Sequence, residues 1–140
     1  MPSYVLDTSA LLALFEYEEG ALQVLEIVQN AGKEGQPRVY LPFMSCMELE
    51  YVALQRFGNP RTEEALRMVR AWPLERRESH PEWASQAARI KARARLSTAD
   101  AWNAALALML DAELVHKDPE FDQVPGLKHR RLPYKTPPRR

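Results

Sequence analysis

The sequence predicts an α/β fold in which helices cover a mostly parallel central sheet. Short apolar runs typical of buried strands alternate along the chain with longer segments whose apolar residues recur three and four positions apart, as on a helix. Strands separated by helices need crossover connections, which make the strands parallel. With 140 residues, 46% of them hydrophobic, the chain is long enough for one domain with a sizeable core.

The first part of the chain predicts a strand, a helical region and a second strand. The strands are the apolar runs 3–7 and 38–42. Between them, residues 9–32 have helical apolar spacing, with Gly20 as a break and Gly32 as a stop.

Four further helices and up to three further strands follow. Residues 45–57 and 62–71 predict two helices separated by Gly-Asn-Pro. Residues 81–96 predict an amphipathic helix, and residues 99–110 are apolar nearly all round, so that helix should lie in the core. The strand candidates are 112–117, which is clear, 127–133, which is weaker and fits a sheet edge, and 72–79, which has room for a short one.

Composition narrows the class of protein. No apolar run reaches the roughly 18 residues of a membrane span, and the N-terminus lacks a signal-peptide pattern, so we expect a cytoplasmic protein without a membrane partner. The single Cys46 is expected to be a small buried apolar side chain. The net charge is zero, but residues 133–140 form a basic, Pro-rich tail, which could meet phosphates or simply be solvated.

Acidic residues stand where a parallel sheet collects functional groups. Asp7 ends the first strand and Asp118 follows a later one, at the carboxyl ends where connections diverge. Glu48 and Asp100 fall near the starts of the helices 45–57 and 99–110, so their carboxylates could reach the same crevice.

Each acid also has a purely structural explanation. Ser45 with Glu48, and Ser97 with Asp100, fit the pattern of an N-cap serine and an acid three residues later. Asp7 could cap the first helix, and Asp118 before a proline could start a turn or short helix. Position alone therefore leaves helix capping and a functional site both open.

Four short motifs in order resemble the PIN-domain family, and most closely its VapC-type toxins of type II toxin–antitoxin systems (ribonuclease VapC). They are VLDTSALLAL, MELEYV, LSTADAWNAALAL and LVHKDPEF. The resemblance spans nearly the whole chain and implies a three-layer α/β/α domain over residues 1–132. It further implies a metal-dependent endoribonuclease that hydrolyses RNA phosphodiester bonds.

The resemblance also assigns site residues. It implies that an acidic cluster holds the catalytic divalent metal, formed by Asp7, Glu48, Asp100 and Asp118. Thr8 and Ser9 match small hydroxyl residues that could orient the first carboxylate. His116 stands where the family usually has threonine, which places the local hydrogen bonding in question. Glu50 does not match the acidic position and is expected to be a surface charge, and Asp122 is a lesser candidate for the fringe of the site.

The metal is expected to be Mg²⁺ or Mn²⁺, because hard cations prefer oxygen ligands. The three histidines, His80, His116 and His129, lack the spacing of a zinc site. Clustered carboxylates should repel one another when no metal is bound, which raises some of their pKa values and lets metal stabilise the fold.

Partners follow from the basic residues and from the resemblance. Candidate phosphate contacts of an RNA substrate are Lys91, Arg93, Arg95 and Lys117, although a solvated helix face is the more common explanation for any single one of them. The family resemblance implies a cognate VapB-like antitoxin and a homodimer. Apolar residues of the region 9–32 could serve either contact or the core: Leu12, Phe15, Leu22 and Leu25.

The alternative is a non-catalytic domain of the same fold that binds RNA or protein and uses its acids as caps. A structure-specific DNA nuclease is a third possibility.

Overall fold

The computed structural model describes residues 2–134, which contain a five-stranded sheet in the order β3-β2-β1-β4-β5. All four strand pairings are parallel. The strands are β1 (Tyr4–Leu6), β2 (Val39–Pro42), β3 (Glu75–Arg77), β4 (Glu113–His116) and β5 (Lys128–Arg131). The parallel sheet is thus confirmed, as are both weaker strand predictions, which form its two edges.

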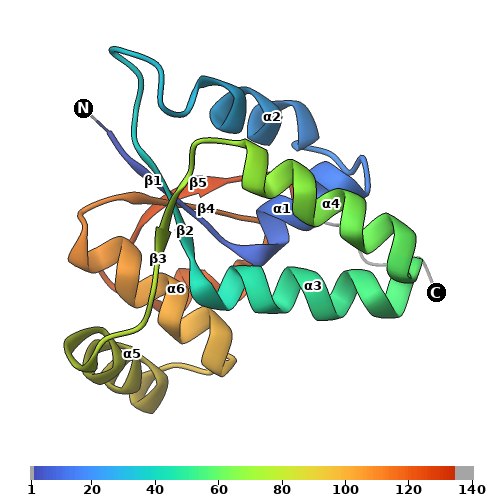
Figure 1. Cartoon of the computed structure of the whole chain (residues 1–140). Coiled ribbons are helices and arrows are strands. Elements are labelled where there is room, and N and C mark those ends of the chain that lie inside the picture. Colours follow the sequence, from blue (N-terminus) through green and yellow to red (C-terminus); the bar gives the residue numbers. More distant parts are fainter. Residues whose placement is uncertain (1, 135–140) are drawn as a thin grey trace.

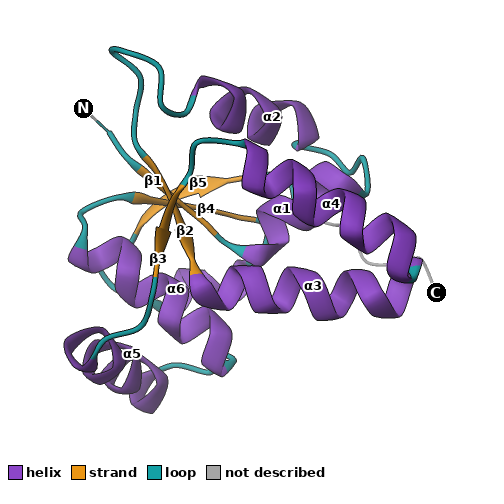
Figure 2. Cartoon of the chain, viewed as in Figure 1, coloured by secondary structure: helices purple, strands orange, loops and turns teal. Residues whose placement is uncertain are grey.

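The helices lie in two layers around the sheet (Figures 1 and 2). One layer packs α1 (Thr8–Phe15), α2 (Ala21–Asn30), α3 (Phe43–Phe57) and α4 (Asn59–Ala71) against one face. The other holds α5 (Pro81–Arg93), α6 (Thr98–Met109) and the short 3₁₀ helix η1 (Pro119–Gln123). The predicted three-layer α/β/α arrangement is therefore confirmed.

The central strands supply the core of both layers. Side chains alternate between the faces of a strand, so Val5 packs with α5 and α6 while Leu6 packs with α1 to α4. In β4, Leu114 and Val115 divide in the same way. Because β1 and β4 are buried on both faces, the residues directly after them are held firmly.

Helix α3 begins two residues earlier than predicted, which corrects the proposed cap at Ser45. Pro42 occupies the position before the helix, and its φ of −65° is compatible with a helix start. Ser45 is buried inside α3, where its hydroxyl donates to the Leu6 carbonyl oxygen at 2.9 Å. Glu48 consequently lies in the second turn of α3.

Helix α4 begins at Asn59 rather than at Thr62, because Pro60 is well suited to a first helical turn. Only Gly58 separates α3 from α4. The break predicted at Gly20 is confirmed, since this residue has a φ of +92° and precedes α2. A Cβ atom at Gly20 would lie 3.0 Å from the Leu132 Cβ atom, so both conformation and space favour glycine there.

The strand order creates a divergence point beside β1. The chain leaves β1 toward β2 and β3, then crosses to β4 and β5 on the other side. Ligand sites of open parallel sheets form at the carboxyl ends of strands at such a point. The crevice between the ends of β1 and β4 is therefore where a site is expected.

Other predictions concern residues away from this crevice. Cys46 is half-buried against the core, and burial raises the pKa of its thiol. Of the predicted tail 133–140, residues 135–140 lie outside the described residues, so the domain boundary stays a prediction. No helix within residues 2–134 is long and apolar enough to cross a membrane.

Candidate active site

Asp7 lies at the carboxyl end of β1 and is almost fully buried. Its Oδ2 atom caps α1 by accepting the Ser9 backbone N–H at 3.1 Å, and it also accepts the Ser9 hydroxyl. The Ser9 hydroxyl in turn accepts the Lys117 backbone N–H at 3.0 Å. Ser9 therefore joins Asp7 to the segment just after β4.

Asn103, which the sequence interpretation missed, holds the other Asp7 oxygen. Its side-chain amide, buried in α6, donates to Asp7 Oδ1 at 2.8 Å and to the Ser45 hydroxyl at 3.2 Å. A buried polar residue in an otherwise apolar helix needs partners, and that mismatch was the available signal. Asn103 and Ser45 together tie α6 and α3 to Asp7.

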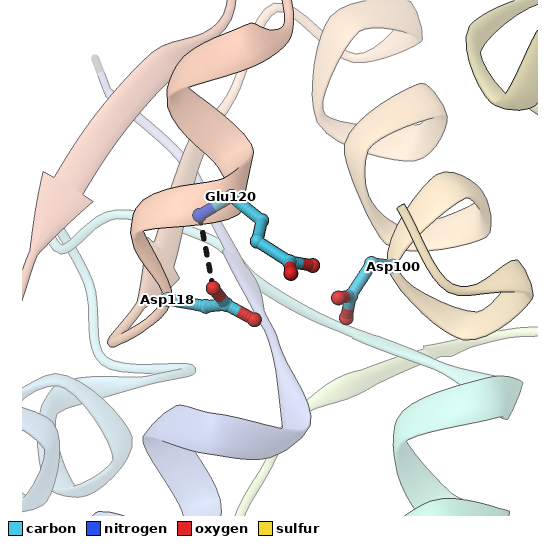
Figure 3. A group of neighbouring side chains, drawn as sticks. All are labelled: Asp100, Asp118 and Glu120. Carbon is cyan, nitrogen blue, oxygen red and sulfur yellow. Dashed lines mark hydrogen bonds between the residues drawn. The ribbon is translucent and has the colours of Figure 1, made fainter. Parts of the chain in front are cut away.

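Asp100, Asp118 and Glu120 form a tight group (Figure 3). One carboxylate oxygen of each lies within 4.8 Å of those of the other two. Asp100 projects from the first turn of α6, whereas Asp118 and Glu120 come from the start of η1. Glu120 was not among the sequence candidates, although its place directly after a helix-starting Asp-Pro was a usable signal.

Electrostatics link Asp100 to all three other predicted acids. Burial, followed by the charges of Asp7, Asp118 and Glu48 in that order, raises its pKa from 3.8 to about 8. Burial also raises the pKa of Asp7, against the lowering effect of its bonds to Ser9 and Asn103. The structure therefore brings the three other predicted acids within electrostatic range of Asp100, as crowding of carboxylates requires.

Glu48 approaches from α3 and is half-buried. Burial raises the pKa of its carboxyl and the charge of Asp7 adds to this effect, while the facing Thr8 hydroxyl opposes it. Asp7 and Glu48 lie outside the tight group of Asp100, Asp118 and Glu120. The site is thus an inner pair from β1 and α3 next to an outer group from α6 and η1.

Helix capping and a site coexist here. Ser97 caps α6 by accepting the Asp100 N–H at 3.1 Å, and Asp118 Oδ1 caps η1 by accepting the Glu120 N–H at 2.9 Å. The Glu120 N–H occupies only one oxygen of Asp118, and the Ser97 side chain also hydrogen-bonds to the Asp100 carboxylate, which lowers its pKa. Helix capping is therefore confirmed for α6 and η1, and it leaves carboxylate oxygens available to a ligand.

The residues fit a hard divalent cation. All the acids offer oxygen, the ligand that Mg²⁺ and Mn²⁺ prefer. A further buried oxygen beside Asp7, Asn103 Oδ1, has no hydrogen-bond partner among residues 2–134. Buried polar atoms are normally paired, including with water or an ion. A cation with its waters would satisfy this donor set and relieve the repulsion at Asp100.

His116 supports the loop that carries Asp118. The ring is fully buried, and its Nδ1 atom accepts the Asp118 backbone N–H at 3.1 Å. Burial lowers the pKa of His116 to about 4, with the charges of His129 and Arg131 adding to the effect. His116 is therefore neutral near pH 7 and provides the acceptor for this amide.

The four basic residues predicted to contact phosphates have different surroundings. Lys117 has only 6% of its side chain exposed, and its ammonium group donates to the Glu19 carbonyl oxygen at 2.9 Å, toward the α1–α2 connection. Lys91 donates to the Leu96 carbonyl oxygen at 2.9 Å. Arg93 and Arg95 are exposed, and their guanidinium groups have no partner within the described part of the chain.

Arg95 is held at the rim of the site. Gln123 of η1 accepts the Arg95 backbone N–H at 2.9 Å, which links the α5–α6 connection to the helix that carries Glu120. Asp122, in contrast, bonds to Arg131 at 2.7 Å on the other side of η1 and is not part of the acidic group. Glu50 is exposed, as expected of a surface charge.

The architecture defines an α/β domain with clustered carboxylates at the divergence point of a parallel sheet. The chain belongs to the PIN domain family, whose model matches residues 4–127. A comparison with curated proteins finds no match.

Solved structures with similar folds include several toxin–antitoxin proteins. VapBC2 from Rickettsia felis, bound to a DNA fragment from its promoter, matches with a TM-score of 0.74 and 15% identity, covering 93% of this chain and 98% of that chain. The DNA-bound VapBC of Salmonella typhimurium matches with a TM-score of 0.73 and 19% identity, covering 94% of this chain and 98% of that chain. The sarcin-ricin loop cleaving toxin VapC20 of Mycobacterium tuberculosis matches with a TM-score of 0.69 and 17% identity, covering 86% of this chain and 93% of that chain. At these identities the likeness concerns the fold.

Proposed function

We propose that this PIN domain is a metal-dependent endoribonuclease and the toxin of a toxin–antitoxin pair. The observation that carries the proposal is the convergence of four separate chain segments on one acidic site, in which burial and the neighbouring carboxylates raise the pKa of Asp100 to about 8. Carboxylates kept this close, at the sheet position where ligands bind, are unfavourable without a cation.

The metal ligands in this proposal come from two parts of the site. Asp7 and Glu48 form the inner part, Asp100 and Asp118 the outer part, and Glu120 is an added candidate from the same group. Bound Mg²⁺ or Mn²⁺ supplies Lewis-acid activation of water and offsets charge developing at the scissile phosphate.

The protein's own residues prepare this site. Ser9 and Asn103 fix both oxygens of Asp7, so its position costs no rearrangement when a ligand arrives. The η1 cap fixes Asp118 with one oxygen facing away from the capping bond. Burial and the neighbouring carboxylates raise the pKa of Asp100 to about 8, so a cation bound here would favour release of the Asp100 proton to solvent.

RNA would reach the acids along the α5–α6 connection. Arg93 and Arg95 are exposed there, with guanidinium groups that no side chain of residues 2–134 pairs, and Gln123 holds Arg95 beside η1. Phosphates are therefore expected to contact these arginines, whereas the buried Lys117 ammonium group is suited to a structural role.

An antitoxin partner is part of the proposal because similar folds occur in toxin–antitoxin complexes, such as that of Klebsiella pneumoniae. Leu22 of α2 is 80% exposed and available to a partner, while Leu12, Phe15 and Leu25 are partly buried against the core. A VapB-like antitoxin, a homodimer and a cytoplasmic location together complete the proposed assignment.

Cleavage of RNA tests the proposal directly. Purified chain is incubated with structured RNA, with single-stranded RNA and with DNA, in Mn²⁺, Mg²⁺ or EDTA. We expect RNA cleavage that requires metal and is lost in Asp7→Asn and Asp118→Asn. Glu50→Gln, which changes an exposed acid two residues from Glu48, is the matched control and should cleave like wild type.

The result also separates the alternatives. The presence of His116 in place of the family's usual threonine favours a non-catalytic binding domain as the second candidate. RNA binding that survives Asp7→Asn, with no cleavage by wild type in any metal, would support it. Cleavage confined to DNA would support the DNA nuclease instead.

A further inference from the structure

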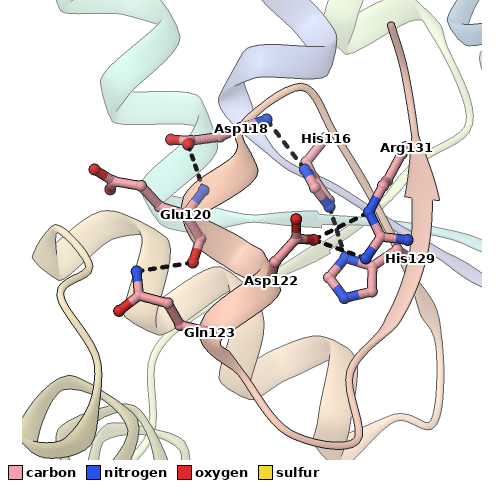
Figure 4. Close-up of polar contacts among 7 residues, drawn as sticks. All are labelled: His116, Asp118, Glu120, Asp122, Gln123, His129 and Arg131. Atoms are coloured by element: carbon pink, nitrogen blue, oxygen red, sulfur yellow. Dashed lines mark hydrogen bonds and ion pairs between the residues drawn. The ribbon is translucent and has the colours of Figure 1, made fainter. Parts of the chain in front are cut away.

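The buried His116 pairs with the partly exposed His129 directly behind Asp118 (Figure 4). His116 Nε2 lies 2.8 Å from His129 Nδ1, and the His116 ring packs on Phe121 of η1 with ring centroids 4.7 Å apart. His129 comes from β5, the edge strand next to β4. Two histidines from neighbouring strands thus meet under the helix that presents Asp118 and Glu120.

The contacts of His116 determine which ring nitrogen carries its proton. A backbone N–H can only donate, so Nδ1, which faces the Asp118 N–H, must be an unprotonated acceptor. The ring is therefore neutral, and its proton lies on Nε2, where it is donated to His129 Nδ1. A chain of donors and acceptors runs from Asp118 through His116 to His129.

We propose that His129 is a positioning residue for Asp118. By accepting the His116 Nε2–H, it fixes the tautomer in which Nδ1 can accept the Asp118 amide. This inference rests on the proposed function in so far as Asp118 holds a metal. A residue that hydrogen-bonds to the group supporting a metal ligand often affects metal affinity, because it fixes the orientation of that ligand without touching the metal.

Loss of this acceptor would leave a buried N–H unpaired. His116 could avoid that by moving its proton to Nδ1, but Nδ1–H would then face the Asp118 N–H, a donor against a donor. The Asp118 amide would be released, and with it the carboxylate that the η1 cap orients. Arg131 binding to Asp122 would still hold η1 to β5 from outside, so the helix itself is expected to remain.

Three variants of β5 test the role of His129. His129→Leu removes the acceptor and keeps an apolar side chain, whereas His129→Asn can place an amide oxygen near the position of Nδ1. Lys128→Leu changes the preceding, exposed residue and is the matched control. The tautomer of His116 is read from ring ¹⁵N shifts by NMR without metal, and the Asp118 amide by hydrogen exchange. Mn²⁺ affinity is measured by calorimetry.

We expect the Nε2-protonated tautomer of His116 in wild type, in Lys128→Leu and in His129→Asn. His129→Leu should change the tautomer, speed exchange of the Asp118 amide and weaken Mn²⁺ binding about tenfold. A purely structural role would lower stability in His129→Leu without changing the tautomer, and would overturn the proposal.

The wild-type spectrum keeps the test decisive even if His129→Leu does not fold. A proton on His116 Nδ1 in wild type would refute the inference without any variant. Absence of Mn²⁺ binding by wild type would refute the proposed metal site instead, while the tautomer and the Asp118 amide would still decide the role of His129.

Discussion

Replacing Asp100 by asparagine should stabilise the metal-free protein at alkaline pH. The wild-type carboxyl has a pKa of about 8 in the folded state and about 3.8 when unfolded. Its stabilising contribution is complete below about pH 3.8, where both states are protonated, and is lost as the pH rises through 8. Asparagine cannot ionise, so the variant escapes this loss.

The size of the effect follows from the difference between the two pKa values. That difference corresponds to at most about 6 kcal/mol above pH 8. The side chain is half-buried and its neighbours can take up the proton instead, which reduces the expected gain in unfolding free energy to about 1–3 kcal/mol. Loss of a negative charge in the first turn of α6 subtracts about 0.5 kcal/mol.

Urea unfolding of wild type and Asp100→Asn in EDTA, at several pH values from 5 to 9, measures this difference. We expect the advantage of the variant to grow with pH and to shrink or reverse when Mn²⁺ is added. Equal stability at pH 9, or a variant less stable than wild type there, would contradict the claim that the acids crowd one another.

Four other substitutions test individual contacts. Asn103→Leu leaves the buried Asp7 oxygen without its donor and should lower the unfolding free energy by about 1–3 kcal/mol, measured by urea unfolding; no loss would mean that this bond is unimportant. Gly20→Ala should cost more than about 1 kcal/mol by thermal unfolding, because φ is +92° and the new Cβ would press on Leu132; an unchanged Tm would refute this. Lys117→Met should lower the stability of the protein without changing the salt dependence of RNA binding. Arg95→Ala should reduce that salt dependence, because it removes a phosphate contact. The reverse pattern would assign the phosphate contact to Lys117 instead of Arg95.

The sequence was sufficient for the fold because its periodic patterns are governed by local rules. Strand 112–117 and helix 99–110 are apolar enough to be recognised alone, and both occur close to their predicted bounds. The start of α3 was placed two residues late, because Ser45 looks like a cap in sequence. In the structure its hydroxyl has a tertiary partner in Leu6, which local reasoning cannot foresee.

The site was predictable in part for the same reason. Asp7 and Asp118 could be found because they follow strands, and Asp100 because it opens a helix. Asn103 and His129 were missed as supporting residues, since their contacts cross 96 and 13 positions of the chain and depend on how α6 and β5 pack. Spacing along a chain does not encode such distances.

The central claim is that these acids form a metal site within the fold. Thermal unfolding of wild type and Asp7→Asn, each with and without Mn²⁺, tests it most directly, because a ligand that binds only the folded state raises its midpoint. We predict that Mn²⁺ raises the Tm of wild type and leaves that of Asp7→Asn nearly unchanged. A wild-type Tm that does not respond to Mn²⁺, or a variant that responds equally, would contradict the account.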